Sequence, residues 1–483
     1  MNRPALRGGL RLESHKLRPL QRPVLSVPSP RTAVLALDQG SGADAAPVVG
    51  PGQAVRVGSL IAAQRGAAAG LHSPVSGTVR CIASRPTVRG IGPCIVIDSD
   101  GRDEREPTSV PLDWRSLSGD ALLERLAAAG IAGLGGAAFP TAAKLGLARS
   151  AGVNLLLLNG AECEPWICCD DALMREHAAD VVLGAQVMLS ACGADRGAIA
   201  VEDDKPQAVA ALAAALAAAA DVRLSVISLP AVFPLGAEGP LVTAVTGREV
   251  PHDGLPPQVG VVCQNVGTAA SVARLVRDGL PVVSRIVTVT GSGVRNPANV
   301  EVRLGTPVAE LIAACGGTTG DDRRLIAGGS LTGRALDDDA APVTKGLNCV
   351  LVATPGDLPP RGTEMPCIRC GDCAVVCPAG LLPQQLHRAT QSDDVEGLSH
   401  FGLGACIECG CCDYVCPSAI ALTARFRVAR ERLRLHEAER ERATQAKSRY
   451  ERHRRRLDEQ AEAERRAFDE ARRRARGDGS AGH

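Results

Sequence analysis

The chain has 483 residues, which is too long for one hydrophobic core and predicts three or four domains. No run approaches the ~20 apolar residues that a membrane-spanning helix needs, and the first residues lack an apolar signal core. We therefore expect a cytoplasmic chain, or one held on a membrane by partners. Aromatic residues make up only 2% and no basic patch is interleaved with them, which argues against single-stranded nucleic acid as a partner.

A small all-β module is predicted for residues 31–105, after an N-terminal extension at 1–30, because short β-forming segments alternate with glycines there. The segments 55–61 and 71–79 resemble the barrel-sandwich domains that carry lipoyl or biotinyl groups. Those carriers attach their group to a lysine at a hairpin tip, whereas no lysine occurs between residues 17 and 143. The module is therefore expected to be structural or to serve docking.

Residues 115–260 predict an α/β domain. A helix over 118–129 leads into a glycine-rich loop at 130–144, and the apolar run 153–158 is typical of a buried parallel strand. That strand ends in the polar segment 159–165. Since ligands in open α/β sheets bind at the carboxyl ends of strands, we expect a binding site there. The alternatives are an ordinary glycine turn and a solvated turn with two unremarkable glutamates.

Lys144, at the end of the glycine-rich loop, is a candidate phosphate ligand. The chain has five lysines against 49 arginines, so arginine is its default cation, and an ammonium is not interchangeable with a guanidinium. The alternative is a surface lysine on a helix. Residues 261–350 then form a further domain with an alternating strand at 286–290, and 351–364 predict an extended linker.

Two C-x2-C-x2-C-x3-C-P runs predict a double 4Fe-4S domain at 365–430. In such runs the fourth cysteine ligates the other cluster, so the expected ligand sets are crossed. One set is Cys367, Cys370, Cys373 and Cys416; the other is Cys406, Cys409, Cys412 and Cys377. Zinc and disulfides are the alternatives, but zinc loops usually offer paired cysteines and disulfides need an oxidising compartment. Cys411 is outside this frame and is assigned to packing.

The last segment, 431–483, is predicted to be an exposed helix or a disordered tail. Residues 424–483 carry 19 Lys and Arg against 12 Asp and Glu, whereas the rest of the chain carries 35 against 41. A solvated tail is the simpler interpretation, and attraction to an acidic partner or an anionic membrane is the alternative.

Several segments together resemble the C subunit of the Rnf electron-transport complex, which is related to the NADH- and FMN-binding flavoprotein subunit of complex I. They are GLGGAAFPTAAKL, NGAECEP, TGREVP, QNVGTAA, CIRCGDC and CIECGCC. The resemblance covers about residues 8–430 and implies a multidomain α/β and α+β fold. Its parts are a barrel-sandwich module, a Rossmann-like FMN/NADH domain, a β-grasp (SLBB) domain and a two-cluster ferredoxin-like domain.

The resemblance also implies site residues, with no catalytic acid or base. Gly133, Gly135, Gly136 and Lys144 contact FMN or nucleotide phosphates, and Phe139 stacks on the NADH adenine. Asn159 and Glu162 line the flavin, Glu164 faces the NADH ribose, and Gln264, Asn265 and Thr268 form a second flavin-facing segment.

The implied function is that of a peripheral, NADH-facing subunit on the cytoplasmic face of a bacterial inner membrane. It would move electrons between NAD(H), FMN and two 4Fe-4S clusters, with ferredoxin as a partner of the whole complex. Two alternatives remain: a soluble flavin and iron-sulfur reductase of the cobalamin-reductase type, and an electron-carrier scaffold without nucleotide binding. Ala237, where the family usually has glycine, keeps the second one open.

Overall fold

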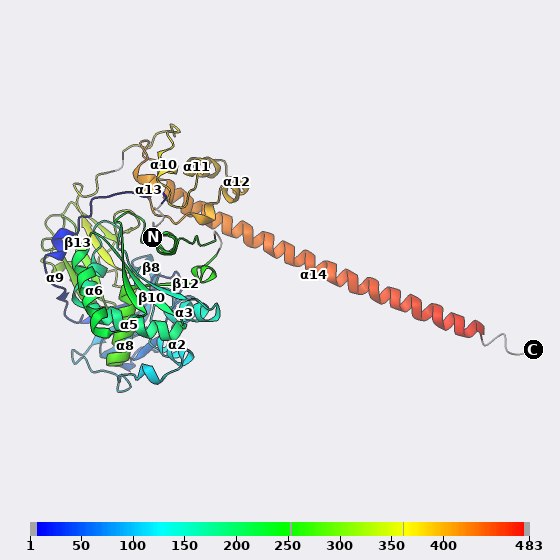
Figure 1. Ribbon diagram of the computed structural model, residues 1–483, viewed down its shortest axis with the longest axis horizontal. Coiled ribbons are helices and arrows are strands. Elements are labelled where there is room, and N and C mark those ends of the chain that lie inside the picture. The colour runs from blue at the N-terminus through cyan, green and yellow to red at the C-terminus, as the bar shows by residue number, and fades with distance from the viewer. Residues whose placement is uncertain (1–6, 252–253, 361, 478–483) are drawn as a thin grey trace, which may run out of the picture. The chain divides into compact units, whose positions relative to one another are not determined.

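The computed structural model describes residues 7–251, 254–360 and 362–477 (Figure 1). These residues fall into two units, one formed by the chain up to 383 with 405–420, the other by 384–404 with 421 onward. A continuous core of buried aliphatic side chains joins three parts of the first unit, namely the β-module, the α/β domain and the β-grasp domain. No described helix is long and apolar enough to cross a membrane.

The predicted β-module consists of two small antiparallel sheets. One has the order β2-β8-β7-β4 and the other the order β3-β5-β6. The strands are β2 (Thr32–Ala36), β3 (Ala46–Pro47), β4 (Ala54–Val55), β5 (Leu60–Ala63), β6 (Leu71–His72), β7 (Gly77–Thr87) and β8 (Gly90–Ser99). β8 buries four consecutive side chains, from Cys94 to Ile97, so both faces of this strand are covered there.

The α/β domain is built on a parallel sheet of order β11-β10-β9-β12. Its strands are β9 (Leu155–Gly160), β10 (Arg196–Glu202), β11 (Leu224–Leu229) and β12 (Val261–Asn265). Its helices are η1 (Trp114–Ser116), α2 (Gly119–Ala128), α3 (Thr141–Ser150), α4 (Cys169–Glu176), α5 (Ala178–Cys192), α6 (Pro206–Ala219), α7 (Glu238–Thr246), η2 (Pro256–Val259) and α8 (Val266–Asp278). The predicted helix at 118–129 is α2, and Ser118 caps it by accepting from the Ala121 amide at 3.2 Å.

The β-grasp domain contains a mixed sheet of order β1-β14-β13-β17-β15-β16. The strands are β1 (Leu25–Ser26), β13 (Ser284–Thr290), β14 (Ala298–Arg303), β15 (Arg324–Ala327), β16 (Arg334–Leu336) and β17 (Cys349–Ala353), with helix α9 (Val308–Ala314) beside them. β1 belongs to the N-terminal segment and pairs in parallel with β14. The start of the chain is therefore part of this sheet.

The remainder of the N-terminal segment also lies against distant parts of the first unit. Helix α1 (Leu17–Leu20) contains Pro19, and the side chain of Asn299 donates to the Pro19 carbonyl at 3.4 Å. Leu10 forms a bridge with Phe233, and the Gly9 amide donates to the Val376 carbonyl at 2.9 Å. These contacts tie residues 9–26 to the α/β, β-grasp and cysteine-rich segments.

The expectation of an extended linker after residue 351 was wrong for its first part. β17 continues to Ala353, and the Leu358 amide then donates to the Thr354 carbonyl at 3.1 Å, closing a turn. Asp357 pins this turn, because its carboxylate accepts from the Ser292 amide at 2.9 Å. Aspartate favours turns because its carboxylate accepts hydrogen bonds from nearby backbone groups, and residues 354–358 therefore form a turn in place of the expected extended linker.

In the first unit the cysteine-rich segment forms two short helices, α10 (Asp372–Val375) and α13 (Cys411–Tyr414), which pack on each other. The remaining elements are α11 (Pro383–Gln391), α12 (Val395–His400), η3 (Leu403–Ala405) and α14 (Leu422–Gly477). Within the second unit α12 packs on the start of α14, where Phe426 and Leu433 are buried. Residues 431–483 were predicted to form an exposed helix or a disordered tail; up to Gly477 they continue α14 without interruption (Figure 1).

Candidate flavin and iron-sulfur sites

Polar side chains converge at the carboxyl edge of the parallel sheet. Asn159 is the penultimate residue of β9 and Asn265 is the last residue of β12, and the two lie opposite each other in the strand register. The side-chain amide of Asn159 donates to the Gly236 carbonyl at 2.8 Å, and the side-chain amide of Asn265 donates to the Asp170 carboxylate at 2.6 Å. Asn265 also caps α8 by accepting from the Gly267 amide at 2.8 Å. The sheet thus brings together the segments around 159, 236 and 265.

The glycine-rich loop is a tight turn fixed to this edge. The Gly133 amide donates to the Phe139 carbonyl at 2.9 Å, and the Leu134 amide donates to the buried Thr268 hydroxyl at 2.9 Å. A Cβ on Gly135 would lie 3.3 Å from that of Asn265, so the loop passes directly over the end of β12. Gly136 has a φ of +117° and open space where a side chain would be, which leaves its backbone accessible to a ligand.

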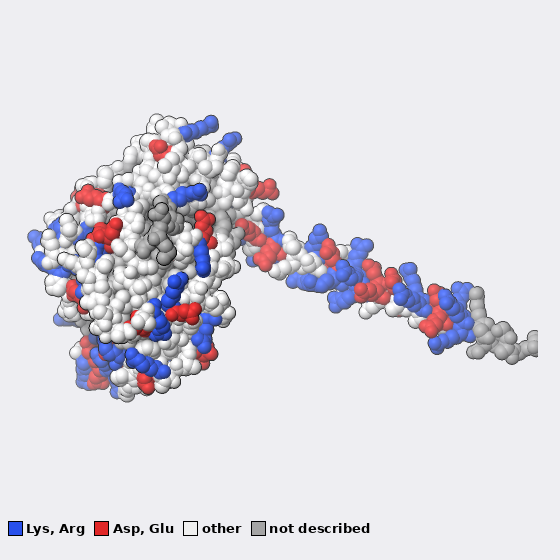
Figure 2. Space-filling view, viewed as in Figure 1, with Lys and Arg blue, Asp and Glu red and all other residues white. Residues whose placement is uncertain are grey.

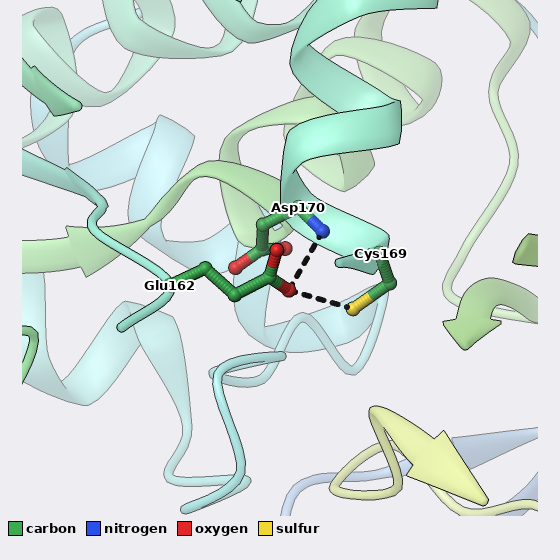
Figure 3. Close-up of side chains that lie close together, drawn as sticks. All are labelled: Glu162, Cys169 and Asp170. Atoms are coloured by element: carbon green, nitrogen blue, oxygen red, sulfur yellow. Dashed lines mark hydrogen bonds between the residues drawn. The ribbon is translucent and has the colours of Figure 1, made fainter. Parts of the chain in front are cut away.

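Glu162 is buried with its carboxylate at the start of α4 (Figure 3). It accepts from the Asp170 amide at 3.0 Å, the Asp171 amide at 3.3 Å and the Cys169 thiol at 3.4 Å. Burial raises the pKa of Glu162, and the neighbouring Asp170 carboxylate raises it further, while Lys16 opposes the rise. The helix N-terminus favours a carboxylate here, so Glu162 is oriented by α4.

Glu164 lies on a cavity of about 290 Å³. Its carboxylate accepts from the Leu331 amide at 3.0 Å, the Thr332 amide at 2.8 Å and the Thr332 hydroxyl. Gly135 and Gly136 line the same cavity, together with the β-grasp loop around Gly328. The predicted glycine loop and Glu164 therefore share one cavity, whose other walls come from the β-grasp domain and from Gly40 and Arg89 of the β-module.

Other predicted site residues lie outside the residues that line this cavity. Lys144 forms an ion pair with Glu238, and Phe139 is 40% exposed on the outer side of the loop. Gln264 is buried, and its Nε2 has no hydrogen-bond partner in the part of the chain that the structure describes. A buried donor without a protein partner is uncommon, so Nε2 is a position where a bound group can accept a hydrogen bond.

The sequence analysis did not identify three buried cations near the candidate site, namely Arg285, Lys345 and Lys16. Arg285 is buried and donates to the carbonyls of Leu134, at 3.1 Å, and Lys345, which links the glycine loop to the β-grasp domain. Lys345 donates to the Gly70 and Gly130 carbonyls at 2.6 and 2.7 Å, and burial lowers its pKa to about 7. Lys16 donates to the Glu162 carbonyl. The scarcity of lysine is the one sequence signal that could have indicated Lys16 and Lys345.

The two cysteine runs have the same backbone conformation at matching positions. Arg369 and Glu408, each before the second cysteine of its run, have φ of +60° and +56°. The next matching pair is Gly371 and Gly410, with φ of +89° and +78°, and the last is Gly380 and Ala419, with φ of +64° and +53°. Non-glycine residues rarely adopt this conformation, so its repetition indicates two loops shaped for the same kind of ligand.

A cysteine of the first run, Cys377, lies close to a cysteine of the second run, Cys409. Burial raises the pKa of the Cys377 thiol, and the thiol of Cys409 in the second run is among the groups close enough to raise it further. Cys411 is buried, as expected for a packing residue. On the other side of the second run, a Cβ on Gly410 would lie 3.2 Å from the Leu331 carbonyl oxygen, in the loop that binds Glu164.

Four sequence families match parts of the chain, in agreement with the predicted fold class. They are the RnfC barrel sandwich hybrid domain at 4–102, the Nuo51 FMN-binding domain at 126–274, the SLBB domain at 286–335 and the 4Fe-4S dicluster domain at 366–420.

Curated relatives match over most of the chain. The C subunit of the ion-translocating oxidoreductase complex of Pseudomonas aeruginosa is 44% identical over 469 residues, which cover 96% of this chain and 60% of the relative. The corresponding C subunit of Rhodobacter capsulatus is 40% identical, covering 83% of this chain and 77% of the relative. That of Erwinia tasmaniensis is 40% identical, covering 94% and 57%. The chain thus spans about six tenths of the length of two of these three relatives.

Among solved structures, an NAD+-reducing [NiFe]-hydrogenase in the H2-reduced state matches with 21% identity and a TM-score of 0.48. The match covers 67% of this chain and 61% of the hydrogenase chain.

Proposed function

This chain belongs to the family of C subunits of ion-translocating oxidoreductase complexes, and on that premise we propose that it is the NADH-facing subunit of such a complex. It passes electrons between NAD(H), a noncovalent FMN and two 4Fe-4S clusters. The chain is peripheral and works on the cytoplasmic face of the bacterial inner membrane, bound to the membrane subunits of the complex. Ferredoxin is the second redox partner at the level of the whole complex.

The observation that carries this proposal is the loop from Gly328 to Gly333. On one side its Leu331 and Thr332 bind Glu164, on the cavity that Gly135 and Gly136 line. On the other side Leu331 contacts Gly410, inside the second cysteine run. One short segment therefore connects the candidate nucleotide cavity to a candidate cluster loop, which is the adjacency that electron transfer requires.

The residues at the cavity fit a flavin nucleotide. The open backbone at Gly136 permits close approach of a ligand at the cavity. Outside the cavity lining, Gln264 has a buried Nε2 without a hydrogen-bond partner in the described part of the chain, next to Asn265 in the sequence. We assign Gly133, Gly135, Gly136, Asn159, Glu162, Gln264, Asn265 and Thr268 to the FMN side of the site, and Lys144 to its phosphate. Bound there, FMN exchanges an electron pair with NADH as hydride and exchanges single electrons with the clusters.

The protein's own contribution is positioning. Glu164 accepts three hydrogen bonds from Leu331 and Thr332, and because a carboxylate has about four acceptor positions, one remains for a ribose hydroxyl of NADH. We propose that Phe139, which is 40% exposed, stacks on the adenine. Asn265, against Gly135, and Thr268, which accepts from the Leu134 amide, hold the glycine loop that carries Phe139.

The test is anaerobic reconstitution followed by an assay of NADH-dependent ferricyanide reduction. We expect about eight irons and one flavin per chain, as two 4Fe-4S clusters and one FMN require. Glu164→Ala should lower kcat/KM for NADH by at least about tenfold, or about 1.4 kcal/mol, while Glu310→Ala, which removes an exposed carboxylate on α9, should leave it unchanged. A chain that binds zinc, or that takes up no flavin, would contradict the proposal. Copurification with membrane subunits separates it from a soluble reductase.

A further inference from the structure

An exposed apolar stripe runs along α14 beyond the part that packs on α12, and we call it the α14 stripe. Tyr450, Leu457 and Phe468 are its large members, with 64%, 51% and 68% of their surface exposed. Tyr450 and Phe468 are 18 residues apart, which is five turns of helix, so they lie on the same face. The full stripe consists of Ala443, Ala446, Tyr450, Leu457, Ala461, Phe468, Ala471 and Ala475.

The spacing within the stripe is that of a coiled-coil seam. Steps of seven residues lead from 443 to 457 and again from 461 to 475, with one step of four between 457 and 461. A four-residue insertion of this kind locally unwinds a coiled coil and keeps its seam on one face. Two seam positions are polar, His453 and Glu464, and such positions fix register and partner choice at a cost in stability.

Positive charge borders the stripe on both sides. Of the twelve flanking positions, nine carry Arg or Lys, two are neutral and one, Asp458, is acidic. The flanking residues are Arg440, Arg442, Lys447, Arg449, Arg454, Arg456, Asp458, Gln460, Arg465, Ala467, Arg472 and Arg474. Among the described residues the structure records an ion pair for only one of these nine cations, Arg474 with Glu470 at 3.1 Å.

Six of the eight acidic residues of the same segment lie away from the stripe and its flanks, and among the described residues only Glu470 forms a recorded ion pair with a flanking cation. These six are Glu441, Glu451, Glu459, Glu462, Asp469 and Glu470. Figure 2 shows both signs of charge along α14 with uncharged surface between them. A helix that is merely solvated needs no such separation, because pairs three or four residues apart stabilise it wherever they lie.

We propose that the α14 stripe docks an α-helix of a partner protein whose own apolar seam is flanked by Asp and Glu. Flanking charges decide which helices pair in coiled coils. A second copy of α14 does not fit, since parallel and antiparallel pairing both place cation against cation. The stripe shares no residue with the lining of the cavity at Glu164, so the inference does not rest on the proposed electron transfer.

An anionic membrane surface is the other possible binding partner of the stripe, but the residue composition of the stripe argues against it. Interfacial helices bury a face rich in Trp, Phe and Leu, whereas five of the eight stripe residues are alanine. Alanines suit the close approach of two helices. Glu464 and His453 would also have to enter the lipid boundary, while at a helix pair they can find polar partners.

The test measures binding of the full chain to two labelled helical peptides by fluorescence anisotropy. Both peptides have the same leucine seam, and one carries Glu and the other Lys at the flanking positions. We expect the chain to bind the Glu peptide at least about tenfold more tightly than the Lys peptide, with an affinity that falls as salt is added.

A matched pair of variants locates the surface. Arg449→Glu with Arg456→Glu reverses two flanking charges, while Arg452→Glu with Arg455→Glu reverses two charges away from the stripe. The flanking variant should lose at least about tenfold in affinity for the Glu peptide and gain affinity for the Lys peptide. The control has the same net charge and should change less than about threefold.

Equal losses in the two variants, or no binding of the Glu peptide, would overturn the proposal. So would tighter binding to vesicles of equal parts phosphatidylcholine and phosphatidylglycerol than to the peptide, which would assign the stripe to membranes. Sedimentation that shows a dimer abolished by Tyr450→Glu would assign it to a second copy.

Discussion

Glu162 and Asp170 are two carboxylates held close together in a buried place. Burial raises the pKa of both groups, and each remains there because hydrogen bonds compensate part of the cost. The Glu162 carboxylate accepts hydrogen bonds from two backbone amides of α4, and the Asp170 carboxylate accepts one from the side-chain amide of Asn265 at 2.6 Å. Neutralising Asp170 would remove its repulsion of Glu162, whose own hydrogen bonds remain. The Asp170–Asn265 hydrogen bond joins α4 to the end of β12.

The crossed cluster ligands give a prediction for single cysteines. Cys377→Ser should remove the cluster built on Cys406, Cys409 and Cys412, while Cys416→Ser should remove the one built on Cys367, Cys370 and Cys373. Iron content should fall by about half in each variant, and electron paramagnetic resonance of the reduced chain should lose a different signal in each.

The control is Cys411→Ser, which replaces the buried cysteine outside the frame and should keep both signals. Loss of the same signal from the Cys377 and Cys416 variants would contradict the crossed assignment.

His72 provides a pH-dependent contribution to stability. Burial, with a smaller contribution from the nearby Lys345, lowers its pKa to about 3, while a hydrogen bond to the Ala128 backbone opposes this. The unfolded chain, with an ordinary histidine pKa of about 6.5, therefore binds a proton between pH 6.5 and 3 that the folded chain excludes. Stability falls as pH decreases through that window, by about 2 kcal/mol at pH 5.

His72→Gln should remove this contribution, so that its urea unfolding free energy changes about 2 kcal/mol less between pH 7.5 and 5 than that of the unsubstituted chain. His436→Gln is the control, since this histidine lies on α14 and is only partly covered. Equal pH dependence in the two variants would exclude His72 as the source.

At the scale of elements, the contact between α5 and α8 depends on one glycine. A Cβ on Gly184 would lie 1.8 Å from the Ala269 carbonyl oxygen of α8. Gly184→Ala should therefore destabilise the chain by about 1–3 kcal/mol or more, although alanine is the better helix former.

Gly146→Ala in α3 is the matched control, because its nearest neighbour, Leu123 Cδ1, would be 3.7 Å from the new Cβ. That variant should gain about 0.5–1 kcal/mol, the ordinary difference between the two residues in a helix. Chemical denaturation of both variants measures the contrast. A Gly184 variant as stable as the unsubstituted chain would show that the helices can separate at no cost.

The loop 328–333 is the second element on which the site depends. It contributes two amides and a hydroxyl to Glu164, and its Leu331 reaches Gly410. The positive φ of Gly328, +100°, lets the chain turn sharply after β15 to make these contacts. The β-grasp domain thus takes part in the candidate site.

At the scale of the whole molecule, the two ends of the chain differ in how they are attached. Residues 9–26 contact three other parts of the first unit, whereas no described side chain between 439 and 475 is buried. A chain ending at residue 439 should keep its iron content and its urea unfolding midpoint. A chain lacking residues 1–30 should lose at least about 2–3 kcal/mol, because the β1 pairing and the Lys16 contact disappear.

These two truncations are compared by iron analysis and urea titration under anaerobic conditions. A large loss of stability from the C-terminal truncation would mean that α14 supports the remainder of the chain. An N-terminal truncation that leaves the midpoint unchanged would mean that residues 9–26 are bound weakly.

The sequence by itself determined the local features and the family. Cysteine spacing, glycine-rich turns and apolar runs are contiguous signals, so the helix at 118–129, the strand in the apolar run 153–158 and both cysteine runs were identified correctly, although the strand itself spans Leu155–Gly160. The fold class followed from the order of these segments and from the resemblance that they carry.

Only the tertiary structure decided what meets at the site. Glu164 with Leu331, Arg285 with Leu134 and Lys16 with Glu162 are separated by more than a hundred residues, and no periodicity or spacing encodes such pairs. They form because buried polar groups must find partners when the sheets pack, and the packing brings together whichever ones lie nearby. The continuity of α14 past residue 435 was likewise open in sequence, since a segment without apolar burial gains little from any one conformation.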